Sequence, residues 1–170
     1  VNVFDPTPRY LRNGRDLAEY VHRDFTYQAF LHACLILLAI QAPLKVDNPY
    51  RRTLTQSGFI TFGSPQVLDC VARVANAALK ASWCHKWLVH RRLRPEAFAG
   101  RVHNHVTKAA AYPMHTTVLN AAALNAVLRA FGSHLLPMAY PEGCPTHPAY
   151  PAGHAAIAGA CATVLKAFFT

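Results

Sequence analysis

Residues 146–170 read THPAYPAGHAAIAGACATVLKAFFT, and this stretch decides the fold. A Pro-Ala-Gly turn at 151–153 precedes an apolar run that is rich in alanine, the strongest helix former. The run predicts a helix over 154–169. Its many small side chains let another backbone approach closely, so we expect this helix to lie inside a bundle of helices.

The rest of the chain has the same helical character. Hydrophobic periodicity predicts further helices near 14–41, 64–92 and 116–131, and no convincing alternating strand pattern is present. These features predict an all-α fold, a helical bundle that forms part of a larger one. We expect residues 1–170 to be a single partial domain, the central piece of a larger helical domain.

Two local signals refine this reading of the helices. Ser64 is the expected N-cap of the second helix, with Pro65 at its first helical position. The segment 95–115 shows no clear period and is predicted to be a connection.

Cys34 and Cys161 lie in apolar helical runs and are expected to be small core residues. The five cysteines include no C-x-x-C pair, which disfavours a zinc site.

The chain is strongly basic, with seventeen Lys and Arg against eight Asp and Glu and a net charge of +9. This charge calls for an anionic partner, a missing acidic portion, or only a solvated basic surface. The hypothesis that the chain binds nucleic acid is supported only by the charge and by the cluster HRRLR at 90–94. No recognisable nucleic-acid-binding motif accompanies them, so we predict no nucleic-acid partner. The longest apolar run, 29–40, is too short to cross a bilayer, so we predict no membrane partner.

The turn at 151–153 carries the first chemical signal. A helix N-terminus presents unpaired N–H groups and a positive dipole end, and Gly153 lets an oxyanion approach the backbone closely. His154 adds a group that exchanges a proton with such an anion near neutral pH. A histidine that only caps the helix is the plainer alternative.

A second cationic cluster supports the site. Lys86 and Arg94 lie near the end of the predicted 64–92 helix, where cations also simply complement the helix dipole. Pro95 disfavours helical geometry at Arg94, which lets its guanidinium fold back toward Lys86. The pair could then clamp a small oxyanion, with the arginine bidentate and the lysine as a point charge.

Longer stretches now resemble a known family. Lys86 followed by Arg94-Pro95, and then Pro151 to His154, resemble two of the three motifs of vanadium-dependent haloperoxidases and related phosphatases. The stretches KWLVHRRLRPEAFAG (86–100) and VHNHVTKAAAYPMH (102–115) resemble the vanadium bromoperoxidases of marine algae. The resemblance implies vanadate as cofactor and hydrogen peroxide, bromide or iodide, and a small organic substrate as partners. It also implies a homo-oligomer when intact, in an extracellular or periplasmic location.

The same resemblance assigns roles to the residues that match. Lys86 and Arg94 would neutralise the equatorial oxygens of vanadate, to one of which the Gly153 amide would donate. His154 would hydrogen-bond an apical oxygen and shuttle protons. The resemblance also makes Asp24 the carboxylate that orients His154, the alternative being a surface ion pair with Arg23 or a neighbour.

Two more residues match the halide side of the pocket. His147 corresponds to a second active-site histidine of bromoperoxidases, which favours bromide and iodide over chloride. Trp83 matches a tryptophan that lines this side in part of the family. An ordinary core aromatic is the equally weighted alternative for Trp83.

Two departures from the family pattern limit the expectation. Position 152 is alanine where the family usually has serine, so one hydroxyl donor worth about 1.5–3 kcal/mol is missing. The third motif, which holds the histidine that ligates vanadium directly, does not occur in this chain. We therefore expect an internal fragment that is inactive alone and folds poorly. A phosphohydrolase of the related acid phosphatase type, or a noncatalytic remnant, stays open as an alternative.

Overall fold

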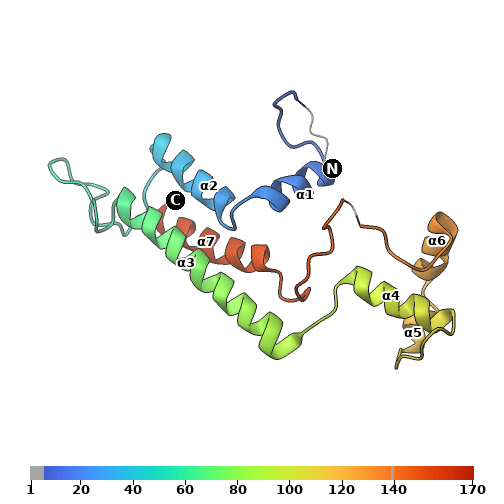
Figure 1. Ribbon diagram of the computed structural model, residues 1–170. Coiled ribbons are helices and arrows are strands. Elements are labelled where there is room, and N and C mark those ends of the chain that lie inside the picture. The colour runs from blue at the N-terminus through green and yellow to red at the C-terminus, as the bar shows by residue number, and fades with distance from the viewer. Residues whose placement is uncertain (1–5, 139) are drawn as a thin grey trace. The chain divides into compact units, whose positions relative to one another are not determined.

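A computed structural model describes residues 6–138 and 140–170, and it is built from helices (Figure 1). Within this described part, bridges between extended residues are isolated, pairing Leu44 with Phe169 and Phe59 with Phe62, and no strand forms. The prediction of an all-α bundle is therefore confirmed. None of the described helices combines the length and the apolar character that a membrane span requires.

The chain divides into two compact units. Arg12–Val89 and Pro151–Thr170 form the first, here named the α3–α7 unit. The second, the α4–α6 unit, contains His90–Tyr150 and the described residues up to Leu11. Whether both belong to one domain of a larger protein stays a prediction.

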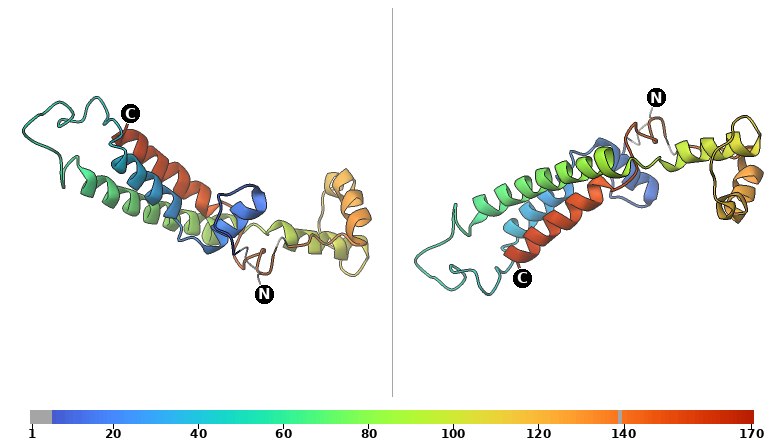
Figure 2. Two further views of the ribbon diagram at one scale, coloured as in Figure 1. Left: turned by 90° about the horizontal axis from the view of Figure 1, so that it is seen from above. Right: turned by 90° about the horizontal axis from the view of Figure 1, so that it is seen from below.

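The α3–α7 unit contains four helices, with α2, α3 and α7 side by side (Figures 1 and 2). Their bounds are Gly14–Arg23 for α1, Gln28–Ala39 for α2, Ser64–Cys84 for α3 and Gly153–Phe168 for α7. The predicted last helix is thus confirmed almost to the residue. One of its faces, formed by Ile157, Cys161 and Leu165, is buried at the four-residue spacing of a helix stripe.

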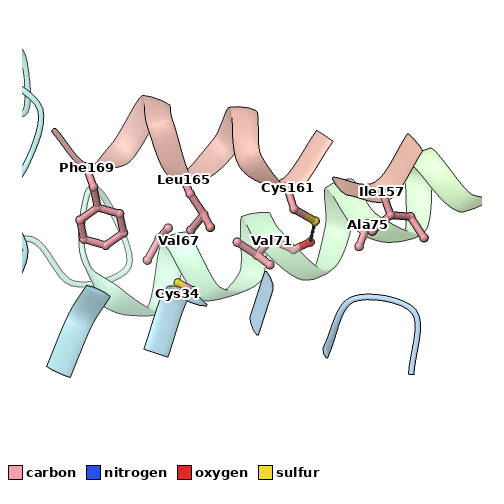
Figure 3. Close-up of a cluster of buried hydrophobic side chains, with 8 residues drawn as sticks. All are labelled: Cys34, Val67, Val71, Ala75, Ile157, Cys161, Leu165 and Phe169. Carbon is pink, nitrogen blue, oxygen red and sulfur yellow. Dashed lines mark hydrogen bonds between the residues drawn. The ribbon is translucent and has the colours of Figure 1, made fainter. Parts of the chain in front are cut away.

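The core of this unit lies between α3 and α7, with Cys34 of α2 at its edge (Figure 3). Val67 lies near Leu165 and Phe169, whereas Ala75 lies near Ile157. The two helices are therefore antiparallel, and the C-terminal end of α3 meets the N-terminus of α7. This arrangement positions the candidate site described below.

The core thiols give a direct test of this packing. Cys34 and Cys161 are fully buried, and burial raises the pKa of both thiols above its ordinary value because a thiolate is poorly solvated there. We expect iodoacetamide at pH 8 to label exposed Cys84 quickly and to leave Cys34 and Cys161 unlabelled, as read by mass spectrometry. Equal labelling of all three in the folded protein would contradict the packing, and urea should make all three reactive.

The same shift has a consequence for stability. Because the pKa of each buried thiol is raised in the folded state, the unfolded chain loses these protons first as the pH rises. The two protonated thiols therefore add to the free energy of unfolding below the ordinary thiol pKa. This added stability is lost progressively as the pH rises above that pKa. The free energy of unfolding should fall in the alkaline range for this reason, alongside any other alkaline titration.

Among its described residues, the α4–α6 unit contains three helices, α4 at Pro95–Val106, α5 at Thr116–Leu119 and α6 at Ala122–Phe131. The predicted connection over 95–115 is wrong in its first half, because α4 occupies it. Pro95 is the first residue of α4, a position that proline favours because its missing N–H has no partner in a first turn. The predicted helix 116–131 is interrupted at Asn120, a residue type that prefers helix ends.

Two helix predictions in the other unit also need correction. The predicted helix 14–41 is broken at 24–27, where Asp24 is extended and caps α1. The N-cap of α3 is Gly63 and not Ser64. Ser64 is the first residue of α3, and just before the helix the backbone N–H of Phe62 donates a hydrogen bond to the Gln66 side chain. A glycine is needed at 63 because a Cβ there would collide with the backbone of Gly58.

The predicted 64–92 helix continues beyond α3 in a different geometry. Residues His85–His90 form a π-helical segment, labelled η1, which contains Lys86. Short π-helical turns are rare and recur at functional sites. The sequence predicted a regular helix through these residues and gave no signal of the π-helical geometry.

Candidate functional site

The N-terminus of α7 is the first part of the site. Ala152 is the N-cap, with extended backbone and no side-chain hydrogen bond, and its carbonyl accepts from the Ala156 amide at 3.0 Å. Because Ala152 has no capping side chain, the N-cap does not occupy the N–H groups of the first turn of α7. These groups carry the positive end of the helix dipole. A Cβ at Gly153 would meet only the Leu79 side chain at 3.8 Å and the Ser82 hydroxyl at 4.0 Å. Packing within the unit therefore does not demand glycine at 153, whereas close approach of a ligand would use it.

His154, the second residue of α7, contacts the carboxylate of Asp24. Its Nε2 lies 3.2 Å from Oδ1 and 3.3 Å from Oδ2. The Asp24 side chain is only 5% exposed, whereas that of His154 is 45% exposed. The pair thus joins a buried acceptor to a histidine that still reaches solvent, and the structure brings together two residues that are 130 positions apart.

The local chain explains why Asp24 can make this contact. The extended backbone of Asp24 ends α1, and its amide donates to the Tyr20 carbonyl at 2.9 Å. The following Phe25, Thr26 and Tyr27 are weak helix formers, so the break costs little. Arg23 instead forms an ion pair with Glu19 at 2.7 Å.

Lys86 is the buried cation of the site, with only 3% of its surface exposed. It follows Ser82 by four residues, about one helical turn, and Ser82 donates its hydroxyl to the Pro151 carbonyl at 3.4 Å. The turn of helix before Lys86 therefore lies against the start of α7. Trp83 is 52% exposed, so it is not a core aromatic of this unit.

Arg94 and His147 lie in the α4–α6 unit, and each is described within that unit alone. Arg94 is extended, with φ −70° and ψ 154°, as the following Pro95 predicts. Its Nε is buried without a hydrogen-bond partner among the described residues, which leaves a donor available for a ligand. His147 is exposed, and its Nδ1 lies 3.1 Å from the Pro148 carbonyl. The clamp of Lys86 with Arg94 and the halide role of His147 stay predictions.

The donor set indicates the kind of ligand that fits. A buried ammonium, helix N-terminal amides and an imidazole offer positive charge and N–H donors, which suit an oxyanion such as vanadate or phosphate. A bare metal cation would need several acidic, histidine or cysteine ligands. No group of three such side chains forms a cation site in the described ranges.

A pocket in the α4–α6 unit offers a contrast. It has a volume of about 200 Å³ and is lined by apolar side chains, among them Phe98, Val102 and Leu124, together with His134. Lys and Arg do not occur among the residues that line it. An anion would lose its hydration there without compensation, so this pocket does not suit the oxyanion.

Sequence reasoning missed two features of the site, the π-helical segment around Lys86 and the hydroxyl of Ser82. For Ser82, the only signal in the sequence was a serine one turn before Lys86. This signal carries little weight, because serine is a common residue and the burial of Ser82 is known only from the fold.

Comparison with known proteins adds the family relationship. The chain is 42% identical to a vanadium-dependent bromoperoxidase of Corallina pilulifera and 41% identical to that of Corallina officinalis, in both cases over 98% of its length. It is 36% identical over 97% of its length to a vanadium-dependent bromoperoxidase of Ascophyllum nodosum. The chain spans 31% of the length of each of these relatives. No protein-family model matches the chain.

Proposed function

We propose that this chain, which belongs to the vanadium-dependent haloperoxidase family, is part of a bromoperoxidase. The proposed enzyme uses hydrogen peroxide to oxidise bromide or iodide to hypohalous-acid equivalents that halogenate small organic molecules. One observation carries the proposal beyond similarity: the His154–Asp24 pair, at 3.2 Å, stands at the N-terminus of α7. A histidine that can exchange protons therefore lies next to a helix N-terminus that can bind an anion.

Lys86, the Gly153 amide and His154 would hold vanadate in the α3–α7 unit. For Arg94, the role of a further donor to vanadate rests on the family resemblance alone. When bound, vanadate supplies a Lewis-acid centre that activates peroxide without a change of oxidation state. Lys86 offsets the negative charge of the anion. Its burial strengthens this effect, because charges interact more strongly away from water.

The proposal also gives each ring nitrogen of His154 a role. A carboxylate only accepts hydrogen bonds, so in the proposed tautomer Nε2 keeps its proton and donates a hydrogen bond to Asp24. Nδ1 is then the nitrogen that takes up or releases a proton toward the ligand. Asp24 fixes the ring orientation and stabilises the imidazolium that forms when Nδ1 is protonated.

The remaining assignments concern the halide and the assembly. On the family resemblance, we assign His147 and Trp83 each a role in halide binding, and His147 supports a preference for bromide and iodide. The half-exposed indole of Trp83 is available for such a contact. A homo-oligomer is the proposed assembly of the intact protein.

The test uses the gene expressed together with any coding sequence that follows Thr170. We expect bromination of a phenol dye that requires peroxide, bromide and added orthovanadate, and that is lost when vanadate is removed with a chelator at low pH. Recovery on renewed addition of vanadate is the internal control.

The alternatives give different results in the same assay. Hydrolysis of a phosphate ester without bromination would overturn the proposal in favour of a phosphohydrolase. If a folded protein that contains the third motif shows neither bromination nor phosphate-ester hydrolysis, the protein is a noncatalytic relative.

A further inference from the structure

We infer that Ser82 is a positioning residue of the oxyanion site, because its buried hydroxyl ties the turn before α7 to α3. The inference rests on the proposed function, since the ligand concerned is vanadate. Neither the motif residues nor the similarity to bromoperoxidases assigns a role to this serine.

The contact spans 69 residues of sequence. Ser82 is only 2% exposed, and its Oγ donates to the Pro151 carbonyl at 3.4 Å. The same oxygen lies 4.0 Å from the position that a Cβ on residue 153 would take. The hydroxyl is therefore next to both ends of the Pro151–Gly153 turn.

The Pro151 carbonyl needs such a donor. It precedes the helix, and the first intrahelical bond of α7 uses the carbonyl of Ala152, which accepts from Ala156. Proline has no N–H, and Ala152 has no side-chain donor, so this turn cannot brace itself with a side-chain hydrogen bond. Ser82 supplies a brace from another helix.

This brace links the two halves of the site within one unit. Lys86, in η1, follows Ser82, near the end of α3, by about one turn and is similarly buried, so both face the inner side of this helix and its π-helical continuation. A shift of the turn relative to α3 changes the separation between the Lys86 ammonium and the Gly153 amide. Displacements of about 1 Å can reduce the efficiency of such a site by up to 100-fold.

The experiment compares Ser82→Ala, Ser82→Thr and the control Thr163→Ala. Thr163 also donates a hydroxyl to a backbone carbonyl, that of Gly159 at 2.7 Å, but it lies further along α7 and is exposed. The variants are made in the protein expressed with any coding sequence that follows Thr170. Orthovanadate affinity is measured by titration of its apoprotein, and KM for bromide is measured at saturating vanadate. We expect Ser82→Ala to weaken vanadate affinity about tenfold, the upper range for one lost hydrogen bond, with KM for bromide unchanged.

The rank order of the variants separates positioning from space filling. Ser82→Thr keeps the hydroxyl, so affinity should return to within about threefold of the unsubstituted protein, and Thr163→Ala should leave it unchanged. If Ser82 only fills space, the larger threonine should be worse than alanine in this buried position, for both affinity and Tm. A threonine variant that is worse than the alanine variant, or an unchanged vanadate affinity in Ser82→Ala, would overturn the inference about Ser82 and leave the proposed function standing. Failure of the unsubstituted protein to bind vanadate would overturn the proposed function and the inference together.

Discussion

Lys86→Met should weaken orthovanadate binding by about two to four orders of magnitude while the protein stays folded. Methionine has a similar length and an unbranched apolar side chain, so it fills the buried site that lysine occupies. The loss follows because removing one charged partner from a buried ion pair costs about 3–5 kcal/mol. Vanadate affinity from titration of the apoprotein, with Tm measured in parallel, checks the prediction.

Lys80→Met is the matched control for Lys86→Met. Lys80 lies on α3, six residues earlier, but its side chain is exposed. The substitution removes the same formal charge, and solvent and salt screen that charge from the site. We expect its vanadate affinity to change less than about twofold. Equal losses in the two variants would show that net charge, and not a defined contact, governs binding, and the assignment of Lys86 would fail.

The parts of the site that sequence alone predicted are those encoded locally. The α7 helix and its glycine-histidine start follow from alanine-rich composition and the turn at 151–153. The extended backbone of Arg94 follows from Pro95 in the same way, because a proline restricts the residue before it. Each of these depends on residues within one turn of the feature.

The parts that needed the fold depend on contacts distant in sequence. The break after α1 was missed because periodicity continues through it, whereas the structure uses Asp24 there to meet His154. The pairing itself was expected only from the family resemblance. Ser82 was missed for a related reason: its partner Pro151 lies 69 residues away, and one serine has no periodic signature. Helix α4 was missed because its histidines and asparagine weaken the apolar pattern.

His154→Ala should reduce kcat for bromide oxidation by about 100- to 10,000-fold, the range expected for loss of a general acid–base group. Vanadate affinity should fall less, because Lys86 and the α7 amides still hold the anion. Asp24→Asn should reduce kcat by about 10- to 100-fold, as outer partners of site histidines commonly do. The asparagine keeps the side-chain shape and loses the charge that stabilises the imidazolium. Steady-state kinetics at saturating vanadate and peroxide separate kcat from binding.

The double variant decides whether Asp24 acts through His154. If it does, adding Asp24→Asn to His154→Ala should cost almost nothing more, because the group that Asp24 orients is already absent. Glu19→Gln is the control, since Glu19 is an acidic residue of the preceding helix α1 whose carboxylate pairs with Arg23 and not with the site. Its kcat should stay within about twofold of the unsubstituted protein. Additive losses in the Asp24 and His154 double variant would assign Asp24 an independent role, and the 3.2 Å contact would then be a structural pairing without a part in proton transfer.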